Sequence, residues 1–580
     1  MVSSRGIAFV SALWFGISVL APVSSQIIVK PPQKIEPKTA IVPKVKKDLG
    51  LATAPEDFQP DTALSFTYMF QFNAYSVKAG DDAAECRKLV IPSEKEGKPV
   101  IYLDRGAFMG LDMLEEVVLP DTINSIGAEA FKDCTRLVSV NIPEGVTYIG
   151  WEAFQGCSSL STIDLPDSCQ ILLASTFAGC AALESIELPS VLRTVEASVF
   201  QDCASLTEIR LPEGLAEIPA SLFEGCASLR DLAIPASVRN VRSYAFADCS
   251  SLVSISIPEG VTRIEKETFR GCSSLETLEL PSSLLYVGEA AFRGLDAPIA
   301  IDLPQGLMGI GREAFADCPG LESLLIPDSV VSLGEFLCRD SSGLRAVTIG
   351  GTGVIRFRAF YGCSALERVT LREGIRTIED NAFQGCGALR QVNLPQTLVS
   401  IGDFAFENCV GLVNLVLPDQ LREIGEWAFH GCSNLSRLQL PRQARTVIGE
   451  QAFGLCEKLD NLVIPGNITT VGPTAFLHCT GLKNLTISEG VLAIEDEAFT
   501  GASLECLVLP STIRSVLHHA FNPCPDLKTI TVKATVPPNL GGSPFPPRWD
   551  LVSIHVPSSS LAAYVAAQNW DWYKALIRGY

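Results

Sequence analysis

The sequence has few of the residues on which enzymes and metal sites most often depend. Histidine occurs only five times in 580 residues, and the histidines do not repeat at one position along the chain. No Gly-x-Ser-x-Gly, His-Glu-x-x-His or Walker motif is present. The cysteines are not grouped at the short spacings of a zinc site. These absences argue against an enzyme, and we expect no catalytic residue, no metal and no cofactor.

Positive charge is also in deficit. Lysine and arginine total 45 against 65 aspartates and glutamates, which gives a formal net charge of -20. A protein that binds nucleic acid must neutralise phosphates with lysine and arginine, so we expect no nucleic-acid partner. Solubility is the simplest role of the acidic excess.

Long apolar runs are confined to the first 25 residues. Residues 7–21, after Arg5, are mostly apolar, and Ser24 and Ser25 follow shortly afterwards. This pattern is typical of a secretory signal peptide over residues 1–25, with cleavage before Gln26. The run is short for a membrane span of roughly 20 residues, which leaves an uncleaved anchor as the alternative. We expect a secreted or cell-surface protein that does not span the membrane after cleavage.

Residues 26–60 differ from the rest of the chain. Six lysines and four prolines lie between residues 26 and 50. This composition predicts an extended, disordered linker. It serves either as a spacer or as a contact with an anionic polymer of the cell envelope.

A phenylalanine followed three residues later by a cysteine recurs at a step of 23 residues. A fixed period in this range is typical of a solenoid of stacked coils, each too small to bury its own apolar face. The repeat phenylalanines are Phe108, Phe131, Phe154, Phe177, Phe200, Phe223, Phe246, Phe269, Phe292, Phe315, Phe360, Phe383, Phe406, Phe429, Phe453, Phe476, Phe499 and Phe521.

One coil is represented by residues 137–159. Apolar residues alternate with polar ones over 137–142, which predicts a short β-strand that Pro143 ends. Gly145 allows a turn, and residues 146–149 favour a second short strand. Residues 153–157 are interpreted as one helical or 3₁₀ turn that directs Phe154 and Cys157 into the interior.

These units resemble the leucine-rich repeats of the BspA-like, Treponema-type family. The shared pattern is Leu-x-x-Ile-x-Leu-Pro followed by Ile-Gly-x-x-Ala-Phe-x-x-Cys, over residues 89–532. Residues 551–557, 560–564 and 570–573 resemble the family's terminal strand and helix. The resemblance implies a secreted or surface-exposed protein that binds other proteins or cells, and it implies no catalytic residue.

The expected architecture is an α/β repeat. It is a right-handed leucine-rich repeat solenoid of about 19 coils of 23 residues, with a parallel β-sheet, short helical turns on the other side and a C-terminal strand-helix cap. Residues 61–107 form an N-terminal capping region with a first degenerate repeat, 108–532 form the solenoid, and 533–580 form a Pro/Gly-rich loop and the cap.

Most of the nineteen cysteines are expected to be reduced, although disulfides are usual in exported chains. Fifteen follow the repeat phenylalanine by three residues, and Leu111, Leu295 and Ala502 occupy the same position in other coils. The position therefore needs only a small apolar group. Parallel neighbouring side chains also keep their Cβ atoms too far apart for a disulfide. Cys338 is exceptional, because it lies where a repeat phenylalanine is expected.

The repeat is irregular over residues 292–360. Residues 295–298 replace the cysteine segment and residues 349–353 replace the Leu-Pro turn. The irregularity is either a packing defect or a functional epitope, because loops that leave a repeat often carry binding.

Outward-facing strand positions are the candidate binding surface. They are acidic in the first half of the array and mostly neutral in the second, with no tryptophan or tyrosine. Asparagine and glutamine at positions 391, 414, 461 and 484 are expected to bond to each other along the solenoid. A basic protein surface would complement the acidic half. The candidate partner-binding residues are Glu116, Asp164, Glu187, Glu208, Asp231, Glu279 and Asp302.

The function that these features favour is an adhesin that binds a host, matrix or neighbouring-cell protein through the repeat surface. The alternative is a passive extracellular or envelope scaffold with no specific ligand. A monomer is expected in both cases.

Overall fold

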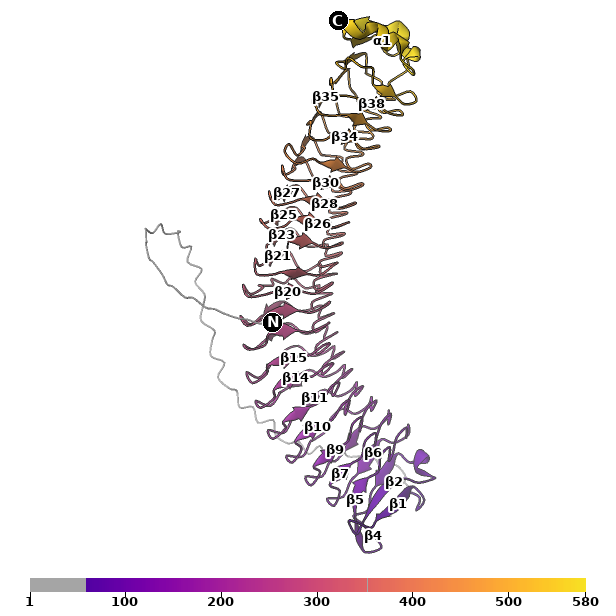
Figure 1. Ribbon diagram of the computed structural model, residues 1–580. Helices are drawn as coiled ribbons and strands as arrows, with labels where there is room; N and C mark the ends of the chain where they lie inside the picture. Colours follow the sequence, from indigo (N-terminus) through magenta and orange to yellow (C-terminus); the bar gives the residue numbers. More distant parts are fainter. Residues whose placement is uncertain (1–58, 352) are drawn as a thin grey trace, which may run out of the picture. The chain divides into compact units, whose positions relative to one another are not determined.

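The computed structural model describes residues 59–351 and 353–580. The predicted signal peptide, and the predicted linker as far as residue 58, lie outside the described residues. Residues 57–580 form one compact unit in which coils stack in sequence order (Figure 1). The stack is a parallel-strand solenoid of about 22 turns, against about 19 expected, because strands at both ends of the repeat array join it.

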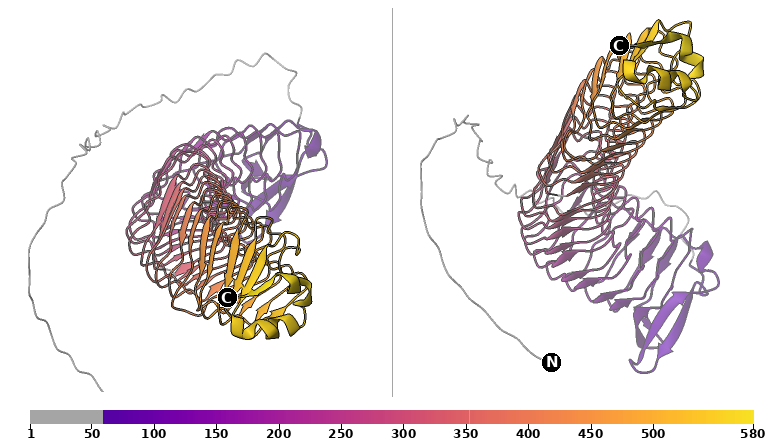
Figure 2. Two further views of the ribbon diagram at one scale, coloured as in Figure 1. Left: turned by 90° about the horizontal axis from the view of Figure 1, so that it is seen from above. Right: turned by 45° about the horizontal axis from the view of Figure 1, so that its top comes forward.

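Each coil contributes up to two short strands, as the repeat unit predicts. In the representative coil these are β8 (Ser139–Val140) and β9 (Tyr148–Ile149). Each strand pairs in parallel with its equivalent about 23 residues away, so the strands form two rows along the coils, each divided into several sheets (Figure 2). Alternation places one strand residue in the core and its neighbour in solvent, as Val140 and Ser139 show.

The first strands of the coils form one face, here called the first-strand face. Its members are β3 (Lys88–Val90), β6 (Glu116–Val118), β8, β11 (Ser185–Ile186), β13 (Glu208–Ile209), β16 (Ser254–Ser256), β18 (Thr277–Glu279), β21 (Ser323–Ile326), β23 (Ala346–Ile349), β25 (Arg368–Leu371), β27 (Gln391–Asn393), β29 (Asn414–Val416), β31 (Arg437–Gln439), β33 (Asn461–Ile464), β35 (Asn484–Ile487), β37 (Cys506–Leu509), β39 (Thr529–Val532), β41 (Ser553–Val556) and β42 (Ile577–Gly579).

The second strands form the other face. Its members are β1 (Leu64–Met69), β2 (Ala74–Ala79), β5 (Lys98–Leu103), β7 (Ser125–Ile126), β9, β10 (Ile171–Leu172), β12 (Thr194–Val195), β14 (Glu217–Ile218), β15 (Asn240–Val241), β17 (Arg263–Ile264), β19 (Tyr286–Val287), β20 (Gly309–Ile310), β22 (Ser332–Leu333), β24 (Val354–Ile355), β26 (Thr377–Ile378), β28 (Ser400–Ile401), β30 (Glu423–Ile424), β32 (Val447–Ile448), β34 (Thr470–Val471), β36 (Ala493–Ile494), β38 (Ser515–Val516) and β40 (Asn539–Leu540).

The segment that carries the repeat phenylalanine is a series of turns, so the prediction of a helical or 3₁₀ turn was wrong. Glu152 and Gly156, which flank Phe154, have φ of 56° and 74°. Left-handed residues four positions apart, on either side of the phenylalanine, prevent a helix. They direct alternate N–H groups to the next coil instead, where the Phe154 N–H donates to the Thr176 carbonyl oxygen at 2.9 Å.

The phenylalanine rings stack along the core. Successive ring centroids are 5.2–6.0 Å apart from Phe108 to Phe315 and 5.0–5.3 Å apart from Phe360 to Phe521. Cys338 takes the place of the ring between the two stacks, as its spacing predicts. Its N–H donates to the Ala359 carbonyl oxygen at 2.7 Å, the bond that a repeat phenylalanine makes elsewhere.

All nineteen cysteines are free thiols, as predicted for the fifteen that follow a repeat phenylalanine by three residues. The Cys157 thiol donates to the Phe131 carbonyl oxygen of the preceding coil at 3.0 Å, and the Cys479 thiol does the same to Phe453 at 3.3 Å. Burial raises the pKa of the Cys479 thiol to about 12. Cys506 is exposed, because it lies at an outward position of β37.

Among the ion pairs of the irregular region, that of Asp328 with Arg372 joins residues two coils apart. An Arg372 guanidinium nitrogen lies 2.8 Å from an Asp328 carboxylate oxygen, and these residues are 44 positions apart. A Cβ atom at Gly350 would lie 1.9 Å from the Asp328 Oδ1 atom, so only glycine leaves room for this contact. The first-strand sheet continues through β21, β23 and β25, whereas the second-strand sheet that contains β22 ends there and another begins at β24.

Both ends of the stack are closed by other elements. At the N-terminal end, β1 and β2 form an antiparallel hairpin, β2 pairs in parallel with β5, and β4 (Glu94–Lys95) pairs with β5. The 3₁₀ helix η1 (Ala83–Glu85) follows this hairpin.

The C-terminal end carries the strand and helix that the sequence predicts. After β41 come η2 (Ser558–Ser560), α1 (Leu561–Ala566) and η3 (Asp571–Leu576), and β42 then pairs with β41. Tyr564, Trp570 and Tyr573 are buried between these elements and the last coils. This segment is here called the C-terminal cap.

Candidate protein-binding face

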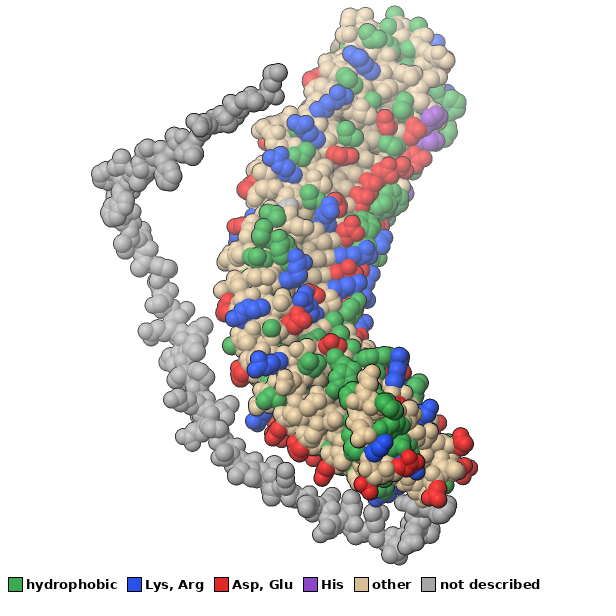
Figure 3. All heavy atoms as spheres, turned by 60° about the horizontal axis from the view of Figure 1, so that its bottom comes forward, with side chains coloured by type: hydrophobic (Ala, Val, Ile, Leu, Met, Phe, Trp, Pro, Cys, Tyr) green, Lys and Arg blue, Asp and Glu red, His purple; other side chains and the backbone are tan. Residues whose placement is uncertain are grey.

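The first-strand face displays the predicted partner-binding residues at outward positions. Side chains alternate along each short strand, so every coil adds polar groups to the same outer surface. Figure 3 shows side chains of both charges interspersed along one face of the coils. The exposed members of the predicted set are Asp164, Glu187, Glu208, Asp231, Glu279 and Asp302.

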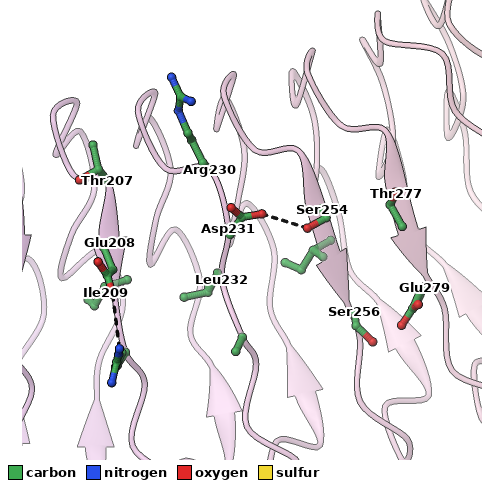
Figure 4. Close-up of a pocket in the computed structure, with 13 residues that line it drawn as sticks. Thr207, Glu208, Ile209, Arg230, Asp231, Leu232, Ser254, Ser256, Thr277 and Glu279 are labelled. Carbon is green, nitrogen blue, oxygen red and sulfur yellow. Dashed lines mark hydrogen bonds and ion pairs between the residues drawn. The ribbon is translucent and has the colours of Figure 1, made fainter. Parts of the chain in front are cut away.

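Three of the predicted residues meet around one open hollow. Glu208 lies on β13 and Glu279 lies on β18. Asp231 lies in the first of the two coils between them and forms a bridge to Ser254 of β16 in the second (Figure 4). The floor is low because Ala233 and Ser256 occupy positions that carry Arg210 and Glu279 in the flanking coils. Small side chains between large ones therefore produce a concave site on an otherwise regular face.

The hollow is of mixed charge, which the prediction of an acidic surface did not foresee. Arg210 and Arg230 line it together with the three carboxylates, so the charged lining sums to -1 from three acidic and two basic residues. A Glu208 carboxylate oxygen lies 3.7 Å from an Arg210 guanidinium nitrogen. The Ser254 hydroxyl donates to an Asp231 carboxylate oxygen at 3.0 Å.

Sequence reasoning missed the other polar residues of the hollow. Arg230 directly precedes Asp231, and the predicted binding residues did not include this position of the coil. The remaining hydroxyl groups come from Thr207, Ser254, Ser256 and Thr277. Each of these residues occupies the same position in its coil as another lining residue. Alignment of the coils in the sequence could therefore have identified them.

The other predicted residues lie outside the hollow. Glu187 and Asp302 are on coils beside it, Asp164 is one coil further along, and Glu116 is on β6. Glu116 is half-buried, and its carboxylate lies 2.9 Å from the Lys88 ammonium nitrogen, so it is already paired. Among the described residues, Asp164, Glu187 and Asp302 have no ion pair or hydrogen bond to their carboxylates. They stay candidate residues for the same surface.

The amide ladder expected in the second half does not form. The Gln391 amide nitrogen donates to the Asn393 side-chain oxygen of its own strand at 3.4 Å, and Asn461 donates to the neighbouring Asp460 at 3.0 Å. The side chains of Asn461 and Asn484 occupy paired positions without a bond between them in the part that the structure describes. Solvation of exposed amides competes with such bonds.

Groups suited to metal chemistry are not assembled within residues 59–351 and 353–580. No group of three or more histidine, cysteine, aspartate or glutamate side chains there could hold a metal ion. The helices of this part of the chain are also too short and too polar to cross a membrane.

Comparisons with known proteins agree with this architecture. The family described as "BspA type Leucine rich repeat region (6 copies)" matches residues 101–230, 216–345, 353–453 and 446–564. A comparison with curated protein sequences gave no match.

Solved structures of similar proteins come from several bacteria. A leucine-rich repeat protein from Bacteroides ovatus is 26% identical with a TM-score of 0.51, over 71% of this chain and 95% of that one. The leucine-rich repeat protein of T. pallidum is 30% identical with a TM-score of 0.32, over 33% of this chain and 90% of that one. A leucine-rich cell surface protein from Faecalibacterium prausnitzii is 22% identical with a TM-score of 0.27, over 75% and 96%.

The family match covers more than half of the sequence, and its repeat is the one that builds the coils described above. The chain belongs to the BspA-type leucine-rich repeat family.

Proposed function

We propose that this protein is an exported adhesin that binds a protein partner through the first-strand face, with the hollow between Glu208 and Glu279 at the centre of the contact. The observation that carries the proposal is the hollow itself, where polar side chains of four neighbouring coils converge. Repeat proteins use such extended surfaces for binding, and the side chains on them are free to differ from coil to coil.

The chemistry of the hollow favours a macromolecule over a small metabolite. It is open to solvent, and its lining carries hydroxyls and charges of both signs without an aromatic side chain. Sites for small molecules usually include aromatic side chains on which the ligand packs. A protein surface supplies complementary charges at several points at once.

The partner is expected to present a basic group to Asp231 and Glu279. Glu208 is already near Arg210, so its charge is partly satisfied. The carboxylates of Glu187 and Asp302 extend the acidic character to the coils on either side of the hollow. An acidic group on the partner would in turn meet Arg230.

Export and surface display rest on the signal-peptide pattern of residues 1–25 and on the family. A protein of this family outside the cell would act on matrix or cell-surface proteins. The second candidate function is the passive scaffold, in which the repeats set spacing and no partner saturates the surface.

The test measures binding of matrix and cell-surface proteins to the parent chain and to a double variant that carries Asp231→Asn and Glu279→Gln. We expect the double variant to lower affinity about tenfold at low ionic strength, with a smaller difference at high salt because salt screens exposed charges. The matched control is Glu423→Gln with Asp526→Asn, which removes the same charges at exposed positions away from the hollow.

Three results would decide the question. A saturable partner lost selectively in the hollow variant supports the proposal. Equal losses in the hollow and control variants would contradict the assigned surface and leave only a general charge effect. No saturable partner for the parent chain would favour the scaffold.

A further inference from the structure

A second cleft lies between the last coils and the C-terminal cap. It has a volume of about 690 Å³, and small-molecule sites are usually about 300–1,000 Å³. One wall comes from β40 and the turn after it, and the other comes from the segment after α1 and the start of η3. Its polar lining residues are His518, Asn539, Ser543, Gln568, Asn569 and Asp571, and Trp572 lies beside them.

The cap segment that lines this cleft is firmly held. Trp570 is buried, and its indole nitrogen donates to the Pro538 carbonyl oxygen at 3.1 Å. Tyr573 is also buried, and its hydroxyl donates to the Phe545 carbonyl oxygen at 3.0 Å. Asp571 and Trp572 lie between these two anchors, so their backbone is fixed in position before any ligand binds.

Several hydrogen-bonding groups in the cleft are available. Within the described residues the side chains of Asn539, Gln568 and Asp571 are exposed and have no hydrogen bond or ion pair. The Gly542 N–H donates to the His518 Nδ1 atom at 3.1 Å, so the His518 Nε2 atom of the neutral ring carries the proton and acts as a donor. The cleft therefore offers two amides, a carboxylate and an imidazole N–H.

Trp572 adds an aromatic surface to these polar groups. Its side chain is 57% exposed although it belongs to the cap and not to a free end. The Arg548 guanidinium carbon lies 5.7 Å from the ring centroid and is in cation–π contact with it. An exposed indole beside amide and carboxylate groups has an apolar body next to directional hydrogen bonds.

We propose that this cleft binds a neutral oligosaccharide. A hexose presents C–H groups that stack on an aromatic ring and hydroxyl groups that both donate and accept hydrogen bonds. Trp572 matches the first, and Asn539, Gln568 and Asp571 match the second. No lysine or arginine lines the cleft in the described structure, since Arg548 contacts the Trp572 ring from outside the lining. Asp571 would repel a phosphate or sulfate, so an anionic ligand is disfavoured. This site is independent of the protein-binding face.

The test measures binding of cellohexaose, maltohexaose and mannohexaose to the full chain by isothermal titration calorimetry. We expect one of these probes to saturate a single site with a Kd of about 1 mM or tighter. Trp572→Ala should weaken binding at least about tenfold, and Asp571→Asn should weaken it with the fold and the indole intact. The matched control is Trp549→Ala, which removes another exposed tryptophan, 71% accessible, that does not line the cleft.

The outcomes separate cleanly. Selective loss with Trp572→Ala and Asp571→Asn, with binding by Trp549→Ala unchanged, supports the site. Absence of saturable binding to all three probes overturns the proposal. So does equal loss in the two tryptophan variants, or stronger binding of a heparin hexasaccharide than of any neutral probe.

Discussion

At the scale of single residues, the chain repeats one buried pair in nearly every coil. A phenylalanine ring stacks on the rings of neighbouring coils. The thiol three residues later donates to the carbonyl oxygen of the phenylalanine in the preceding coil. Where Cys338 replaces the ring, Ser341 replaces the thiol, and its hydroxyl donates to the Phe315 carbonyl oxygen at 2.7 Å. The hydrogen bond to the phenylalanine carbonyl oxygen of the preceding coil is therefore kept where the ring stack is interrupted.

The buried thiols predict that stability falls at alkaline pH. Burial raises the pKa of Cys134, Cys203 and Cys479 from 9.0 to about 12. Between these values the folded state holds more protons than the unfolded state, so the free energy of unfolding decreases as pH rises. Each such thiol contributes a slope of about 1.4 kcal/mol per pH unit in that window, and its contribution is fully present below pH 9.

This prediction is checked by urea unfolding under reducing conditions from pH 8 to 11. The triple variant Cys134→Ala, Cys203→Ala, Cys479→Ala should show a shallower decline than the parent, since Ala502 shows that alanine occupies the same position. Cys506→Ala, which removes the exposed thiol, should leave the slope unchanged. Parallel curves for the parent and the triple variant would show that thiol titration does not govern the decline.

At the scale of the element, the turns around each phenylalanine depend on residues in the left-handed conformation. The position two residues after the phenylalanine has positive φ at Gly179 (74°), Asp202 (57°) and Asn408 (58°). Asparagine, aspartate and glycine tolerate this conformation best, whereas a β-branched side chain does not. These residues therefore keep the segment from becoming a helix and align its N–H groups with the next coil.

Replacement of Gly179 separates backbone strain from crowding. A Cβ atom there would come no closer than 3.4 Å to its nearest neighbour, the Gly156 nitrogen, so space is adequate. Gly179→Val is expected to cost about 1–2 kcal/mol of unfolding free energy because of its positive φ, and Gly179→Asn is expected to cost less. Chemical denaturation of both variants provides the comparison. Equal costs would mean that packing, and not the backbone conformation, limits this position.

At the scale of the whole molecule, the solenoid needs closed ends. Each coil leaves strand edges and apolar side chains that only the next coil or a cap can cover. At the C-terminal end, β41 and β42 extend the first-strand sheet, while Tyr564 and Trp570 bury the last apolar side chains. The cap is thus part of the same core.

Deletion of residues 551–580 is expected to make the protein self-associate, because the edge of β39 and the Phe545 ring would face solvent. Size-exclusion chromatography with light scattering measures this directly. A chain that lacks residues 26–56, which precede the compact unit, is the matched control and should stay monomeric. A monomeric cap deletion with unchanged unfolding would contradict the role of the cap.

The sequence by itself determined the repeat, the two strands of each coil, the buried phenylalanine and cysteine positions and the terminal strand and helix. The repeat, the strands and the buried positions follow from local spacing that recurs many times, so neighbouring coils confirm one another. The terminal strand and helix follow from the resemblance to the family. The place of Cys338 in the phenylalanine stack was also predictable, because the period alone identifies it.

Only the tertiary structure decided the conformation of the turns and the shape of the surface. The three-residue spacing of Phe154 and Cys157 fits a helical turn as well as it fits the turns observed. The hydrogen bonds of this segment to the next coil exclude the helical turn. The hollow depends on the small side chains of Ala233 and Ser256 lying between larger ones in adjacent coils. Contacts between residues 23 or more positions apart, such as those of Asp328 with Arg372, exist only once the coils are stacked, because no local pattern specifies them.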